Sequence, residues 1–195
     1  MGKEQDVFIL AQESLLNVVN QIAEDQWGLD VPAYMTYGGK KATLRDLVNY
    51  HAYDDAWVPD VLAGKTAEEV GSKYDGDLLG ADPKDSYANY NSTATEAVRT
   101  FADLDKIVHL SYGDFPAGEY LKHITSFRGF RAYTIAHFIG VDTTLFAGLV
   151  DGLWDEIMPN IEEWRSMGVF GPAVDVPKGA DKQTQLLALT GFLQK

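Results

Sequence analysis

The chain has 195 residues, of which 46% are hydrophobic, 23% charged and 12% aromatic, and it contains no cysteine. This balance is typical of one soluble globular domain, here residues 1–195, and it excludes collagen, disordered chains and disulfide scaffolds. The formal net charge of −13 repels phosphate backbones and anionic lipids, so nucleic acid and membrane are not expected as partners. Because charged residues interrupt the first ten positions, no signal peptide is predicted and we expect a cytoplasmic protein.

The hydrophobic pattern predicts a mainly helical chain. Helices are expected over 5–25, 43–63, 82–102, 116–139, 143–158, 160–167 and 182–193, an extended piece over 107–112, and surface segments over 27–41 and 65–81. Thr43 with Asp46 three residues later has the form of a helix N-cap, and Gly64 and Gly140 have the form of C-terminal stops. The expected architecture is all-α, a four-helix bundle with C-terminal helical and extended additions.

Polar residues interrupt the apolar face of the predicted second helix. One inward stripe contains His51 and Asp55, one turn apart, and the neighbouring stripe contains Tyr50, Asp54 and Trp57. A histidine and a carboxylate one turn apart could supply two ligands to a divalent metal, with a third from another helix. A simpler interpretation, which we prefer, is that these groups form hydrogen bonds with polar residues across the bundle.

The predicted fourth helix brings Arg131 into an inward stripe together with Phe127. A buried guanidinium requires an anion, because an unpaired charge is costly in a low dielectric. The first interpretation pairs Arg131 with Asp54 or Asp55. The alternative is that Arg131 binds the carboxylate of a ligand, which its planar fork suits.

Three stretches of the sequence resemble a known family. TLRDLVNYHAYDDAWVP (43–59), SFRGFRAYTIAHFIGVD (126–142) and the tail segments WRSMGVFGPAV and LLALTG are similar to parts of the DinB-like proteins. They are most similar to the branch that contains the mycothiol-dependent maleylpyruvate isomerases. The three stretches occur in the family's order and, with their spacing, cover most of the chain.

The resemblance implies a four-helix bundle that holds a divalent metal, commonly zinc or nickel, and that uses a low-molecular-weight thiol. The metal ligands of the family are a histidine of the second helix and two residues one turn apart on the later helix. Position by position, these places are taken by Tyr50, Phe127 and Arg131. Since neither Phe nor Arg can ligate a cation, we expect the family's metal site to be lost and no cofactor to be bound.

A rebuilt metal site would use His51, Asp55 and His123. Two functions therefore remain open. The favoured one is a metal-free bundle that binds a small acidic or aromatic ligand at Tyr50, Asp54, Trp57, Phe127 and Arg131. The alternative is a metal- and thiol-dependent transferase or isomerase. Homodimerisation through a helix face is compatible with both, and no catalytic residue is assigned.

Overall fold

The computed structural model describes residues 2–36, 39–176 and 178–194 of a mostly helical chain. The helices are α1 (Lys3–Val19), η1 (Ala33–Met35), α2 (Leu44–Ala63), α3 (Ala67–Val70), α4 (Pro83–Thr100), α5 (Ala117–Ile139), α6 (Ala147–Ile157), η3 (Met158–Asn160), α7 (Ile161–Ser166) and α8 (Lys182–Thr190). Parts of the predicted loop 27–41 and of the C-terminal tail, at residues 37, 38 and 177, lie outside the described residues.

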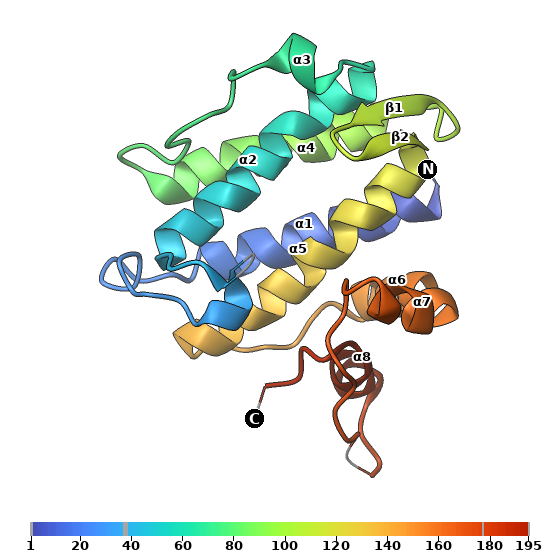
Figure 1. Ribbon diagram of the computed structural model, residues 1–195. Helices are drawn as coiled ribbons and strands as arrows, with labels where there is room; N and C mark the ends of the chain where they lie inside the picture. Colours follow the sequence, from blue (N-terminus) through green and yellow to red (C-terminus); the bar gives the residue numbers. More distant parts are fainter. Residues whose placement is uncertain (1, 37–38, 177, 195) are drawn as a thin grey trace.

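Four long helices organise the molecule (Figure 1). The helix α1 packs along α5, α4 packs along α2, and α1 also contacts α4. The facing pair α2 and α5 is joined mainly by side chains that reach from one helix to the other. The polar residues that the sequence predicts to meet lie on these two helices, α2 and α5.

The predicted helix ends of α2 and α5 are confirmed. The Thr43 hydroxyl accepts a hydrogen bond from the Asp46 N–H at 3.2 Å, and the Asp46 carboxylate accepts one from the Thr43 N–H at 2.8 Å. Gly64 and Gly140 follow the two helices with φ of 91° and 76°, a left-handed conformation that glycine adopts without steric cost. The length and placement of α2 and α5 therefore follow from local chemistry.

Several boundaries differ from the prediction. The helix α1 ends at Val19, six residues before the expected end, and the expected surface segment 65–81 contains the short helix α3. The extended piece is confirmed as β1 (Ile107–Leu110), but it pairs antiparallel with β2 (Gly113–Pro116), which was missed. The missed strand reads GDFP, and three of its four residue types are rare in strands.

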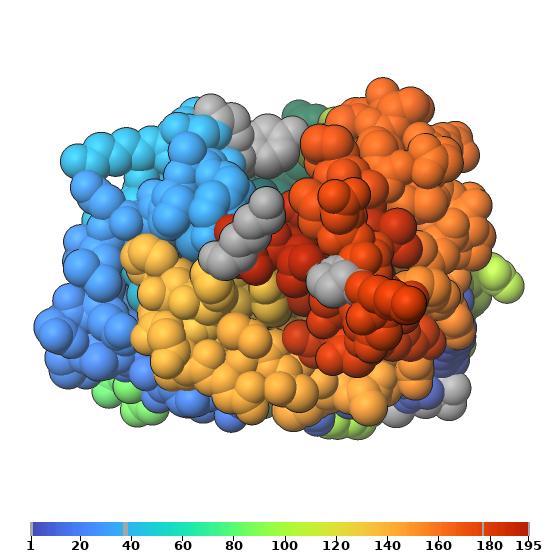
Figure 2. Space-filling model, turned by 90° about the horizontal axis from the view of Figure 1, so that it is seen from below, coloured from blue at the N-terminus to red at the C-terminus, as the bar shows by residue number. Residues whose placement is uncertain are grey.

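The C-terminal segment packs against α5 through aromatic rings. Phe130 of α5 stacks on Phe192 with ring centroids 4.4 Å apart and meets Phe170 edge to face at 5.9 Å. Figure 2 shows the segment, in red, beside the end of α5. These contacts explain why a tail rich in Gly and Pro has a defined place on the fold.

Two apolar clusters form the core, with polar residues at the boundary between them. Along α2, Leu47 and Ala52 belong to one cluster and Val58 to the other, and Asp55 lies between them. Along α5, Leu121 and Phe130 likewise belong to different clusters on either side of a buried arginine. Across the described ranges, no helix is both long and apolar enough to cross a bilayer.

Candidate functional site

A buried ion pair joins α2 to α5. Arg128 is 1% exposed and Asp55 is 0% exposed. The Arg128 guanidinium donates from Nη2 to Asp55 Oδ1 at 2.5 Å and from Nε to the same oxygen at 2.9 Å. Although burial alone would lower the pKa of Arg128, the Asp55 carboxylate raises that pKa above its ordinary value, so the pair stays ionised on the Arg128 side.

Two amide side chains extend this ion pair across the molecule. Gln12 of α1 donates to Asp55 Oδ1 at 2.9 Å and accepts from Arg128 Nε at 3.2 Å. The side chain of Asn91 on α4 donates to the backbone carbonyl of Gln12 at 3.1 Å. All four long helices therefore contribute to one buried hydrogen-bonded layer, whose role is to fix how they pack.

The ion pair predicted for Arg131 is wrong. The sequence pairs Arg131 with Asp54 or Asp55, whereas the structure pairs Arg128 with Asp55. The inward face of α5 is rotated relative to the predicted stripe, which leaves Phe127 53% exposed. The signal that could have identified Arg128 is its position between the small residues Thr125 and Gly129, both of which are buried in the structure.

Arg131 makes a different set of contacts. Its Nε donates to His51 Nε2 at 3.1 Å, and its Nη1 donates to the backbone carbonyl of Met35 at 2.7 Å. Within the described part of the chain, no carboxylate lies within 4.0 Å of this guanidinium and Nη2 makes no hydrogen bond. Burial lowers the pKa of Arg131 to about 10, because the loss of water outweighs the opposing effects of Tyr50, Tyr34 and Asp54.

His51 is held as a neutral ring. It is 2% exposed, and burial together with the Arg131 and Arg128 charges lowers its pKa well below the ordinary value. Because Nε2 accepts the hydrogen bond from Arg131, the ring proton is assigned to Nδ1. This Nδ1 is buried and has no hydrogen-bond partner among the described residues. His51 therefore orients Arg131 without neutralising it.

Asp54 faces the same region from the next turn of α2. No hydrogen bond from a described residue reaches its carboxylate. Burial raises the pKa of Asp54 to about 6, and the nearby charge of Arg128 opposes this rise more strongly than that of Arg131. The structure thus places a carboxylate and a guanidinium near each other without pairing them.

Exposed aromatic rings surround Arg131. Tyr50 is 53% exposed, Phe127 53% and Tyr34 49%, and the phenols of Tyr34 and Tyr50 both affect the pKa of Arg131. We call the group formed by Tyr34, Tyr50, His51, Asp54, Phe127 and Arg131 the Arg131 cluster. Rings this exposed lie outside the packed core and leave apolar surface that a ligand can contact.

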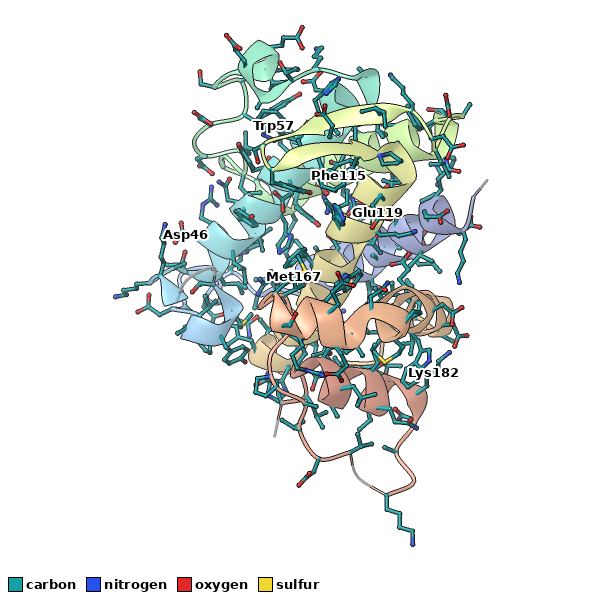
Figure 3. All side chains as sticks on the ribbon, turned by 45° about the vertical axis from the view of Figure 1, so that its right-hand side comes forward. Asp46, Trp57, Phe115, Glu119, Met167 and Lys182 are labelled. Carbon is teal, nitrogen blue, oxygen red and sulfur yellow. The ribbon has the colours of Figure 1, made fainter. Side chains whose placement is uncertain are left out.

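Trp57 lies apart from this group. Its ring packs 5.9 Å from the rings of Tyr53 and Tyr74. Figure 3 shows Trp57 toward the α3 end of α2 and Asp46 near the opposite end, so the Arg131 cluster occupies the stretch of α2 between these two labels. Of the five predicted ligand-binding residues, Tyr50 and Asp54 lie close enough to Arg131 to affect its pKa, and Phe127 lies one turn before Arg131 on α5. Trp57 packs elsewhere.

The predicted metal ligands do not converge. Asp55 is bound by Arg128 and His51 by Arg131, while His123 lies 3.4 Å from the Tyr112 hydroxyl, with its other ring nitrogen 3.5 Å from Glu119. No group of three metal-ligating side chains is found in the described ranges. Because Arg128 binds Asp55 Oδ1 and Arg131 binds His51 Nε2, a positive charge already lies beside each residue, and the two do not fit a divalent cation.

A separate cavity of about 310 Å³ lies between α1, α5 and the loop that follows α5. Its one carboxylate, that of Asp142, is occupied in capping Thr144. We therefore place the candidate site at the Arg131 cluster, where Arg131 and Asp54 have no ionic partner among the residues that the structure describes. Comparison of the chain with family models, curated proteins and solved structures finds no match.

Proposed function

We propose that the protein binds a small ligand that carries a carboxylate and an aromatic body, and that Arg131 receives the carboxylate. The observation that carries this proposal is the partly buried Arg131 guanidinium, which is oriented by His51 and Met35 but has no anion within 4.0 Å among the described residues. A charged hydrogen bond from a fixed guanidinium is stronger than one between neutral groups.

The neighbouring side chains support the same proposal. Arg128, one turn away on α5, is fully engaged by Asp55, so the two arginines have separate roles. The exposed rings of Tyr34 and Tyr50 offer apolar surface near the Arg131 guanidinium, and exposed Phe127 lies one turn before it on α5. An aromatic carboxylate matches both features, since its anion meets Arg131 and its ring covers the exposed aromatic surface.

We further propose that the chain is a DinB-like four-helix bundle without the metal of that family. The motifs in α2, α5 and the tail, together with the packing of the four long helices, support the assignment. The metal- and thiol-dependent alternative gains no support from His51 and Asp55, because both are bound by arginines.

Calorimetric titration with 3-phenylpropanoate tests the proposal, with the neutral 3-phenylpropanamide as the comparison ligand. We expect the carboxylate to bind and the amide to bind at least 10-fold more weakly. The Arg131→Gln variant should lose about 10- to 100-fold in affinity for the carboxylate, as expected for removing one charged hydrogen-bonded pair.

Arg99→Gln is the matched control, because Arg99 is exposed on α4 and pairs with Glu96 on the same helix. This variant should bind 3-phenylpropanoate as the unaltered protein does. Equal affinity of the unaltered protein and Arg131→Gln for the carboxylate, or no saturable binding by the unaltered protein, would contradict the proposal.

A further inference from the structure

We infer that the ligand carries an ammonium group next to its carboxylate, so that the Arg131 cluster recognises a zwitterionic amino acid with an aromatic side chain. Arg131 would hold the carboxylate and Asp54 the ammonium. This inference rests on the proposed function and adds the second charge of the ligand.

The two charges of the cluster are arranged for such a ligand. Arg131 contacts His51 at 3.1 Å, and Asp54 lies three residues after His51 on α2. At a rise of about 1.5 Å per residue, Asp54 lies about 4.5 Å along the axis of α2 from His51, the residue that orients the guanidinium. The guanidinium and the Asp54 carboxylate influence each other's pKa, but they are not within ion-pair distance of 4.0 Å.

Each charge lacks what the ligand would supply. Arg131 has no anionic partner and Asp54 accepts no hydrogen bond within the part of the chain that the structure describes. A buried or half-buried charge without a partner is costly, so both groups favour a ligand that compensates them. A carboxylate alone would neutralise Arg131 and at the same time be repelled by Asp54.

The charge of the whole protein points the same way. With a net charge of −13, the protein repels an anionic ligand, and the repulsion acts on every simple carboxylate. A zwitterion has no net charge and avoids this repulsion. A simple amine would be attracted by the net charge, but it would leave Arg131 without an anion. The zwitterion is the one of these three ligand types that satisfies both groups.

The aromatic side chain of the ligand is inferred from the exposed rings. Phe127 lies one turn before Arg131 on α5, and Tyr50 lies one turn before Asp54 on α2. An aromatic ring bound between these helices would cover apolar surface that is now half exposed on both.

Calorimetric titration of the full chain with three probes tests the inference: L-phenylalanine, 3-phenylpropanoate, which lacks the amine, and phenethylamine, which lacks the carboxylate. We expect L-phenylalanine to bind at least 10-fold more tightly than either. The Asp54→Asn variant should remove this advantage by weakening L-phenylalanine at least 10-fold, while 3-phenylpropanoate binds as well or better. Retained binding of 3-phenylpropanoate shows that the variant is folded.

Asp175→Asn is the matched control, because it removes the same charge from the exposed C-terminal tail. It should leave all three affinities unchanged. Equal binding of L-phenylalanine and 3-phenylpropanoate by the unaltered protein would overturn the inference and leave the proposed function standing. Binding of phenethylamine alone, or of no probe, would overturn both.

Discussion

Replacing Arg128 by Met removes the cation from the buried layer and leaves the carboxylate of Asp55 without a charge partner. Asp55 is 0% exposed, and the neutral Gln12 amide would still donate to its carboxylate. Breaking a buried pair by removing one partner costs about 3–5 kcal/mol, and we expect this loss in the free energy of unfolding at neutral pH.

Arg131→Met is the comparison. This residue is only partly buried, and the substitution removes hydrogen bonds to a neutral ring and a backbone carbonyl. We expect a loss of about 1–2 kcal/mol. Urea unfolding followed by circular dichroism at a helix wavelength measures both variants, with equal m-values showing that the same surface is exposed on unfolding.

A triple variant separates the cost of an orphaned charge from a general loss of packing. Combining Arg128→Met with Asp55→Leu and Gln12→Leu removes the ion pair together with the amide that bonds to both of its members, and buried ion pairs replaced by apolar residues are often neutral in stability. We expect the triple variant to be more stable than Arg128→Met alone. Equal losses for Arg128→Met and Arg131→Met would refute the assignment of a structural role to one arginine and a ligand-binding role to the other.

Three further predictions concern other parts of the fold. Burial raises the pKa of Glu156 to about 7, so the folded state binds the Glu156 proton more tightly than the unfolded state does. The free energy of unfolding should therefore fall as pH rises from about 5 to 7. In a pH series of urea unfolding, Glu156→Gln should remove this slope and gain up to about 3 kcal/mol at pH 8. A Cβ at Gly152 would lie 2.7 Å from Val7 Cγ1, so Gly152→Ala should lower the free energy of unfolding in urea by about 1–3 kcal/mol. A Cβ at Gly28 would have no neighbouring atom within 4 Å, so the control Gly28→Ala should change this free energy by less than about 0.5 kcal/mol. The Asp60 carboxylate binds two lysines and a tyrosine of the segment after α2, so Asp60→Asn should speed proteolysis of that segment while a helical spectrum is retained. Unchanged cleavage would show that the segment is held by other contacts.

Local sequence determined much of the helical framework. The cap formed by Thr43 and Asp46 fixes the start of α2, and Gly64 and Gly140 fix the ends of α2 and α5, since these signals act through neighbouring backbone atoms. The strand β2 was missed for the opposite reason. Its residues disfavour strands, and it is paired because a short turn brings it beside β1.

The sequence also predicted that Arg131 of α5 would meet Asp54 or Asp55 of α2, because charged residues on apolar faces must find partners. It did not determine which arginine. Arg128 and Arg131 are three residues apart, so at 3.6 residues per turn they point only about 60° from each other, and both fit an inward stripe. The choice was made by tertiary packing: Gln12 of α1 meets Arg128 and Asp55, which leaves Arg131 at the edge of the core beside His51.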